Sequence, residues 1–404
     1  MGGGWKNRPP PAGAGSGMEA PRDRPPPPFP HLPPAPAPAA AGAGPKARRR
    51  DPTGPRGDSA RALVSSAEAA KEVMRTHDIK FAQRPSHPSL AKVMWRKELV
   101  EYAGGFKISF LFPSCGLVQR LFGTTEWLDG VHKVTDRLME SMIGQHRSKR
   151  ALEKQKGTTS SSSSEDLLDV LLRVQEDDCT LGFHLSTDAI NAFLLNIFLA
   201  GSETPATLIE WTMAEMIRNP EVMHKAKSEV RKVFGERGKV EESGIHELAY
   251  LKLVIKETLR LHTPTPLVLP RECREECRIF GYDIPLKTRV LVNVWAISRD
   301  PRYWGAEAEK FLPERFLDEK VNFRGTDFEF LPFGAGRRMC PGMTFGLAVV
   351  ELPLANLLFH FDWKLPGGAE PESLNMDEQF GVSLRKKNHL ELIPVVQYNP
   401  LPPV

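Results

Sequence analysis

The chain has 404 residues, of which 41% are hydrophobic and 26% are charged, and its formal net charge at pH 7 is only +4. Residues 1–60 hold nine Lys and Arg against four Asp and Glu, whereas the remainder holds 45 basic against 46 acidic side chains. The basic surplus therefore belongs to the N-terminal segment, and the rest of the chain shows no nucleic-acid footprint. Five cysteines, an odd number, suit a reducing compartment better than a disulfide framework.

Residues 1–60 differ in character from everything that follows. Runs such as Pro25-Pro26-Pro27-Pro28 and Arg48-Arg49-Arg50 offer too little apolar surface to offset the entropy of ordering, so we expect a disordered tail. A polyproline ligand for an SH3-like partner, an organelle-targeting peptide and an uninformative leader are the alternatives, of which the leader is the simplest. The sequence has no run of 18 apolar residues and no apolar signal-peptide core, so we expect no transmembrane segment.

The pattern from residue 61 to residue 404 predicts one folded domain rich in helix. Ala62-Leu63-Val64-Ser65-Ser66 predicts a short strand, and Ser66 is placed to cap the helix that follows. The other predicted elements are helices at 67–74, 124–150, 165 onward, 187 onward, 250–260 and 344–361, a linker at 157–164, strands at 277–282 and 289–294, and a hairpin near 380–384.

The helix that begins near Thr187 is apolar on nearly all sides, which predicts a position through the centre of the domain. An acid and a hydroxyl, Glu203 and Thr204, interrupt it and would be costly to bury without partners. Thr204 can bind a ligand or water, and Glu203 can feed protons toward it. Pro205 cannot donate to the Gly201 carbonyl and should open or kink the helix.

Two smaller patterns carry possible chemistry. Glu257 and Arg260 are neighbours on one helix face, and Arg315 follows in a turn-rich segment. A lone pair of this kind is usually an exposed ion pair worth little. Cys273 and Cys277 suggest a metal clip, but no second ligand pair lies nearby in the sequence, so we expect plain thiols.

The strongest signal is the sequence Phe-Gly-Ala-Gly-Arg-Arg-Met-Cys-Pro-Gly at residues 333–342, called the cysteine loop below. Its glycines let the backbone approach a ligand closely, and Cys340 stands just before a helix N-terminus, whose dipole favours a thiolate. Phe333 would keep water from the sulfur, and Arg338 would pair with a carboxylate on the ligand. A ligand that needs one thiolate and a carboxylate partner is haem.

The cysteine loop matches the signature Phe-x-x-Gly-x-Arg-x-Cys-x-Gly of the cytochrome P450 family at every fixed position. From about Ala62 to Val395 the chain resembles the plant A-type branch of that family. After Phe81-Ala82-Gln83-Arg84-Pro85 an internal block of the family is missing; Trp95-Arg96 comes too soon to replace its propionate-binding pair, so Arg96 is assigned no role. The implied fold is mainly α with a small β region: an incomplete P450 fold with a disordered N-terminal tail.

The resemblance also implies roles for individual residues. These are iron ligation by Cys340, cofactor binding by Phe333, Gly336, Arg338, Gly342 and Arg271, proton delivery to dioxygen by Glu203 and Thr204, a buried network of Glu257, Arg260 and Arg315 behind the cysteine loop, and substrate contacts from Leu267, Val268 and Val382.

The implied activity is that of a haem b monooxygenase, which inserts one oxygen atom of O2 into a small lipophilic metabolite, such as a specialised plant terpenoid, phenolic or indole. Electrons would come from NADPH through a separate reductase, because the sequence has no Gly-x-Gly-x-x-Gly motif after a strand. Two alternatives remain: a non-catalytic remnant that binds haem weakly or not at all, and a haem-thiolate isomerase that does not activate O2. The resemblance implies the cytosolic face of the endoplasmic reticulum membrane, but without an anchor the protein would be cytoplasmic.

Overall fold

The computed structural model describes residues 61–85, 124–155, 165–177, 184–318, 321–379, 381 and 383–396, with the side chains of 124–132 and 154–155 left out. The predicted tail at 1–60, the Trp95-Arg96 dipeptide, the linker at 157–164 and Val382 all lie outside the described residues.

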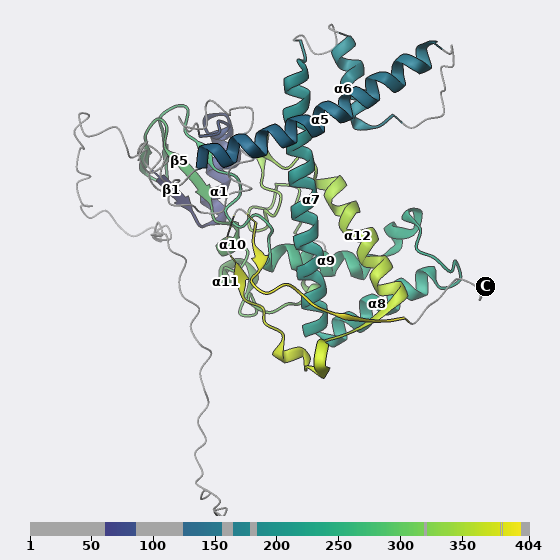
Figure 1. Cartoon of the computed structure of the whole chain (residues 1–404). Coiled ribbons are helices and arrows are strands. Elements are labelled where there is room, and N and C mark those ends of the chain that lie inside the picture. The colour runs from purple at the N-terminus through teal and green to yellow at the C-terminus, as the bar shows by residue number, and fades with distance from the viewer. Residues whose placement is uncertain are drawn as a thin grey trace, which may run out of the picture. The chain divides into compact units, whose positions relative to one another are not determined.

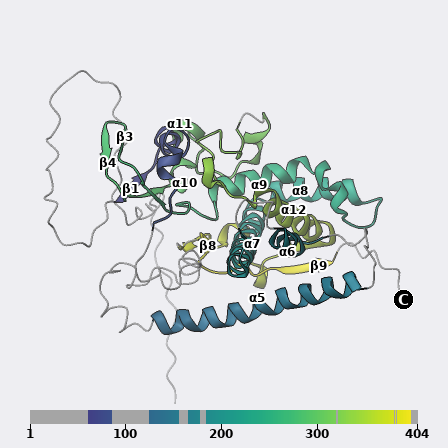
Figure 2. The same cartoon turned by 90° about the horizontal axis from the view of Figure 1, so that it is seen from above.

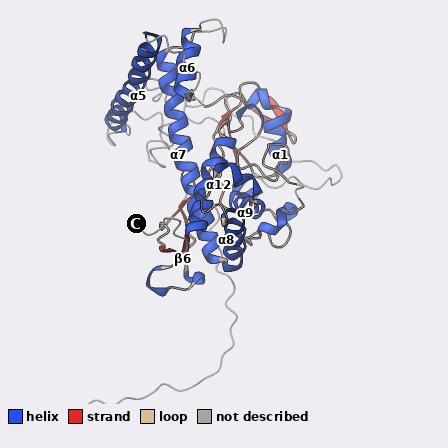
Figure 3. Ribbon diagram, turned by 90° about the vertical axis from the view of Figure 1, so that its right-hand side faces the viewer, coloured by secondary structure: helices blue, strands red, loops and turns tan. Residues whose placement is uncertain are grey.

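Helices make up most of the described chain, and the strands are short (Figures 1 and 3). The α-helices are α1 (Ala67–Lys71), α5 (Thr124–Gln155), α6 (Leu167–Glu176), α7 (Thr187–Arg218), α8 (Pro220–Phe234), α9 (Ala249–Leu261), α10 (Val294–Ile297), α11 (Pro301–Trp304) and α12 (Met343–His360). A π-helix, η1 (Glu72–Thr76), follows α1, and the 3-10 helices are η2 (Asp78–Phe81), η4 (Glu242–Glu247), η5 (Pro313–Phe316), η6 (Gly336–Arg338), η7 (Pro366–Gly368) and η8 (Pro371–Ser373). The expectation of a mainly α protein is confirmed.

The strands form four small sheets. A three-stranded sheet has the order β1-β5-β2, with β1 parallel and β2 antiparallel to β5, and three two-stranded antiparallel sheets pair β3 with β4, β6 with β9 and β7 with β8. The bounds are β1 (Arg61–Val64), β2 (Arg271–Glu272), β3 (Cys277–Ile279), β4 (Tyr282–Ile284), β5 (Arg289–Val292), β6 (Phe361–Lys364), β7 (Glu378–Gln379), β8 (Arg385–Lys386) and β9 (Ile393–Val396).

Local sequence explains several boundaries. Ser66 caps α1 by accepting a hydrogen bond from the Ala69 N–H, as predicted. The predicted strand at 277–282 is wrong in one respect, because it is divided into β3 and β4 by a turn in which Phe280 and Gly281 both have positive φ. β7 and β8 form the predicted C-terminal hairpin, called the C-terminal hairpin below.

The main core surrounds the C-terminal half of α7, which packs against α8, α9 and α12 (Figure 1). From Pro205 to Ile217 most side chains of α7 are buried. Its N-terminal half differs from the prediction of burial on all sides: it packs against α5 (Figure 2), yet Phe193 is 44% exposed and Phe198 is 58% exposed among the described residues. An apolar pattern states which side chains favour burial but not which element covers them.

Two prolines inside helices do not interrupt them. α7 continues through Pro205, where the prediction was an opening or a kink, and α12 continues through Pro353. Near Pro205 the hydroxyls of Thr204 and Ser202 donate to the carbonyls of Ala200 and Phe198, at 2.8 and 2.6 Å. These bonds go to carbonyls beside that of Gly201, the one that Pro205 leaves without a backbone donor.

By length and apolar composition, α7 and α12 are the two described helices that could cross a membrane. Core helices of other folds pass the same test, and both helices pack against described neighbours. Only 28% of the most apolar stretch of each is buried, and Phe345 in the first turn of α12 is 62% exposed. Phe345 therefore does not pack into the main core, whereas Leu347, Leu352 and Leu357 of the same helix do.

Candidate haem site

The cysteine loop turns sharply before α12. Gly334 and Gly336 have φ of 69° and 67°, values that a side chain would strain. The Cys340 N–H donates to the Phe333 carbonyl at 2.9 Å, which closes the loop and sets the cysteine two residues before Gly342, the N-cap of α12. Phe333 packs edge-on against Phe323, with ring centroids 5.5 Å apart. The loop is thus held by its own backbone hydrogen bond and by the packing of Phe333, and its cysteine is exposed.

The Cys340 side chain is exposed, yet enough protein surrounds the sulfur that desolvation raises the pKa of the thiol, an effect that the Gly342 N–H partly offsets by hydrogen bonding. Desolvation thus favours the neutral thiol, whereas the position before the N-terminus of α12 favours the thiolate. Coordination by a metal ion would deprotonate it, because a bound cation dominates the local electrostatics.

Positive charge gathers beside the cysteine loop. Arg271, in β2, is 1% exposed and donates to the Ala335 carbonyl at 2.8 Å, while its Nε and Nη1 atoms have no hydrogen-bond partner among the described residues. Burial, helped by the charges of Arg84 and Arg338, lowers the pKa of Arg271 to about 10, and Asp78 opposes this shift from 3.5 Å. Arg271 Nε has no acceptor among the described residues and Nη1 faces only Asp78, so an anionic group would complete the surroundings of this buried cation. The residues present therefore fit the carboxylates of haem.

Arg338 was expected to pair with a ligand carboxylate. In the structure it is exposed and donates through Nε to the Ala82 carbonyl at 2.6 Å. Arg84 donates through Nη1 to the carbonyls of Leu269 and Pro270, at 2.9 Å each. The segment around Ala82 and Arg84 is thereby tied to both the cysteine loop and the chain leading into β2.

Glu257, Arg260 and Arg315 meet in one buried network. Arg260 donates through Nε and Nη2 to both oxygens of Glu257, at 2.8 Å each, and both side chains are fully buried. Arg315 donates to Glu257 Oε1 at 2.9 Å. The surface pair that isolated spacing would suggest is therefore not what forms. The bidentate pair is buried within α9, and Arg315 of η5 joins it to the segment around η5.

Glu203 and Thr204 stand next to each other on α7 and are half-buried. The expectation that the acid would need a partner is met by a residue that the sequence analysis did not single out: Arg385 of β8 donates to Glu203 Oε1 through Nη2 at 2.6 Å and Nε at 3.0 Å. Gly201, one turn away, faces α12, since a Cβ there would lie 3.9 Å from the Phe345 ring.

Two of the three predicted substrate residues are described. Leu267 and Val268 are half-buried, and Val268 adopts φ of 52°. Val268 Cγ1 lies 3.5 Å from where a Cβ on Gly334 would stand, so it packs against the cysteine loop. The Leu384 N–H donates to the Pro264 carbonyl at 2.8 Å, which joins the C-terminal hairpin to the same segment. Val382, the third, falls outside the described residues.

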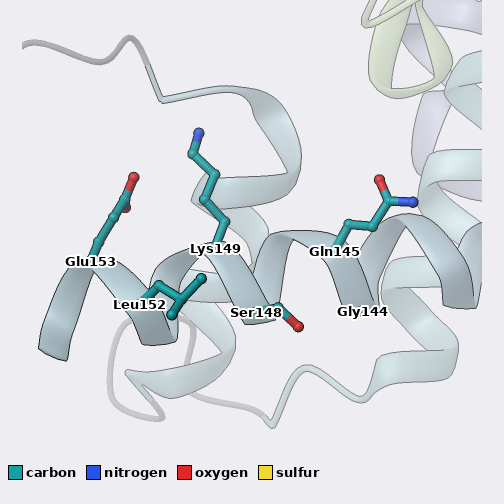
Figure 4. A pocket seen from close by; sticks show the side chains of 6 residues that line it. All are labelled: Gly144, Gln145, Ser148, Lys149, Leu152 and Glu153. Atoms are coloured by element: carbon teal, nitrogen blue, oxygen red, sulfur yellow. The ribbon is translucent and has the colours of Figure 1, made fainter.

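A hollow of about 640 Å³ lies elsewhere, along α5. Figure 4 shows that its lining side chains, including Lys149, Leu152 and Glu153, all come from this one helix. Since no other described element lines this hollow, the described residues do not enclose a ligand there, and we do not take it as a candidate cofactor site.

A mainly α domain whose glycine-rich loop presents a lone cysteine ahead of an apolar helix, with buried arginine donors at its side, defines the haem-thiolate class. The cytochrome P450 family model matches residues 98–392. The chain therefore belongs to the cytochrome P450 family, and its relatives place it in the plant A-type branch.

The chain is similar to several plant proteins of known name. It is 53% identical over 300 residues to desmethyl-deoxy-podophyllotoxin synthase of Sinopodophyllum hexandrum, covering 74% of this chain and 58% of the relative. It is 51% identical over 288 residues to tabersonine 16-hydroxylase 1 of Catharanthus roseus (71% and 55%) and 48% identical over 297 residues to premnaspirodiene oxygenase of Hyoscyamus muticus (74% and 58%). The chain thus spans less than two thirds of the length of these relatives.

Sequence reasoning missed three contributors to this site: Asp78, Arg84 and Arg385. Arg84 lies in a segment that resembles the family but has no pattern of its own that indicates a role, and the other two belong to ordinary polar patterns. Their partners lie up to 259 residues away in the chain, so only the fold brings them together.

Proposed function

We propose that the protein, through its domain at residues 61–404, is a haem b monooxygenase that inserts one oxygen atom of O2 into a small lipophilic plant metabolite. The observation that carries this proposal is that Cys340 is exposed in the same loop whose Ala335 carbonyl accepts from Arg271, a buried cation with an Nε donor that has no acceptor among the described residues. When bound, haem supplies the iron chemistry of oxygen transfer, for which a cysteine ligand favours cleavage of the O–O bond.

The protein residues would have separate tasks. Cys340 would hold the iron, while Phe333, Gly336, Arg338, Gly342 and Arg271 would shape and charge the cofactor's surroundings. Glu203 and Thr204 would move protons, since a carboxylate and a hydroxyl lie side by side on α7. Glu257, Arg260 and Arg315 would keep the cysteine loop in register from behind, and Leu267, Val268 and Val382 would contact substrate.

The relatives support this reaction class by name, since they are a synthase, a hydroxylase and an oxygenase. A specialised metabolite as substrate, electrons from NADPH through a separate reductase, and a place on the cytosolic face of the endoplasmic reticulum membrane are parts of the same proposal.

The ferrous carbon monoxide difference spectrum of the full chain tests it. We expect a strongly red-shifted Soret band that disappears in Cys340→Ala and persists in Cys277→Ala, the matched removal of a different free thiol. A band that survives in Cys340→Ala would refute the assignment of the iron ligand.

A second candidate is a non-catalytic relative that binds haem weakly or not at all. It is favoured by the exposed apolar residues Phe193, Phe198 and Phe345 on α7 and α12. Absence of any thiolate-type band in the wild-type chain would support this candidate over the monooxygenase.

A further inference from the structure

Asp78 is the first residue of η2, and its side chain is 15% exposed. Its two carboxylate oxygens accept one backbone donor, the Arg337 N–H of the cysteine loop, at 3.0 and 3.3 Å. Arg337 belongs to η6, a single helical turn whose first N–H groups have no partner within the turn. Asp78 thus satisfies from outside a donor that the loop cannot satisfy itself.

The loop comes unusually close to Asp78. A Cβ on Gly336 would lie 2.7 Å from Asp78 Oδ1 and would run into the Met74 carbonyl oxygen. The next contact, from Arg338 Nε to the Ala82 carbonyl, is 2.6 Å. Met74, Asp78 and Ala82, spaced four residues apart, therefore face three consecutive loop residues and form a continuous support for them.

Charge reinforces this geometry. Asp78 Oδ1 lies 3.5 Å from Arg271 Nη1, and Asp78 Oδ2 lies 3.5 Å from Arg337 Nε. A carboxylate here reduces the mutual repulsion of the arginines beside the cysteine loop and is itself held by charge-assisted hydrogen bonding. A neutral residue at position 78 would lose both effects.

We infer that Asp78 is a positioning residue for the cysteine loop: by holding the Arg337 N–H and facing Arg271, it fixes the backbone that presents Cys340. The inference rests on the proposed function only in treating Cys340 as the iron ligand. The contacts of Asp78 are with Arg337 and Arg271, so it acts through the loop.

Amide hydrogen exchange in the haem-free full chain tests the contact directly. Loss of a hydrogen bond to a charged acceptor should make the Arg337 amide exchange at least about tenfold faster in Asp78→Ala. Asp300→Ala is the matched control, because Asp300 is 16% exposed and also accepts a backbone N–H, that of Arg302 at 2.9 Å. Equal protection of the Arg337 amide in Asp78→Ala and in the control would overturn the inference.

Asp78→Asn tests whether the acceptor or the charge matters, because its amide accepts through one oxygen only. We expect an intermediate effect, about threefold faster exchange. If Asp78→Ala does not fold, Asp78→Asn provides the test, and unchanged exchange of the Arg337 amide in that variant refutes the role of Asp78 in positioning the loop.

The carbon monoxide difference spectrum then tests whether the position of the cysteine loop affects iron ligation by Cys340. In the haem-loaded chain, Asp78→Ala should lose at least half of the thiolate-type band to the band of a haem without thiolate, Asp78→Asn should lose less, and Asp300→Ala should lose none. A full thiolate band in Asp78→Ala would refute a role in presenting Cys340. If the wild type shows no thiolate band, the proposed function fails, whereas the exchange result still supports or refutes the Asp78 contact.

Discussion

Replacing Glu257 by Gln should destabilise the protein severely. The carboxylate is fully buried and accepts four hydrogen bonds at 2.8–2.9 Å, two from Arg260, one from Arg315 and one from the Leu312 N–H. The amide keeps the shape but removes the negative charge and turns one acceptor into a donor that faces guanidinium groups.

The magnitude follows from what is left behind. Arg260 still donates to the carbonyls of Ser298, Ala308 and Lys310, so it stays in place, but its charge is now buried without a counter-ion. Removing one partner of such a pair costs about 3–5 kcal/mol. This is a large fraction of the stability of a typical domain, which is about 5–15 kcal/mol.

Guanidinium unfolding followed by far-UV circular dichroism measures the effect as a lower midpoint with an unchanged slope. Glu307→Gln is the control, since Glu307 forms the same i,i+3 kind of pair with Lys310 on the surface, and it should leave the midpoint unchanged. If Glu257→Gln unfolds at the same midpoint as Glu307→Gln, the reasoning about the buried network is wrong.

Three further predictions concern the surroundings of the cysteine loop. Gly336→Ala should cost at least about 2 kcal/mol in denaturant unfolding, because φ is 67° and a Cβ meets backbone, whereas a cost near zero would show that the loop can shift. Burial raises the pKa of Glu378, but its imidazole, guanidinium and indole partners lower it by more, so the pKa in the folded protein is depressed. Ionised Glu378 therefore adds to the free energy of unfolding above its pKa in the unfolded chain, and this stabilisation is lost as the pH falls through the folded-state pKa. The acid limb of a stability–pH curve should therefore be shallower in Glu378→Gln, and superimposable curves would contradict this. The Arg385 side chain is 51% exposed, so its ion pair with Glu203 should show a coupling free energy of at most about 0.5 kcal/mol in a double-mutant cycle, and this coupling should vanish at high salt. A coupling several times larger would mean that Arg385 holds the Glu203 carboxylate in one position.

Much of the fold follows from local patterns. The Ser66 cap, the long helix from Thr124 and the start of α7 at Thr187 depend on neighbours within a few residues, and these predictions are confirmed. Two features of the fold that differ from the local predictions also have physical causes. α7 continues through Pro205, and its packing against α8, α9 and α12 cannot be seen in a local pattern. A strand pattern across residues 277–282 likewise cannot show that Phe280 takes a positive φ.

In the candidate site, too, residues close together in the sequence could be predicted, and residues far apart could not. Cys340 and its glycines lie within ten consecutive residues, so the sequence alone predicts this loop. The spacing of Glu257 and Arg260 predicts that they form a pair, but not that the pair is buried. Asp78 contacts Arg337 across 259 residues, and Arg385 reaches Glu203 across 182. Neither contact leaves a periodic or spaced signature, because each joins an ordinary polar residue to a loop or helix fixed by other forces. The sequence therefore predicts the residue that would ligate the iron, Cys340, together with its loop. The residues that hold this loop in place, in the segment 74–82, are identified only from the structure.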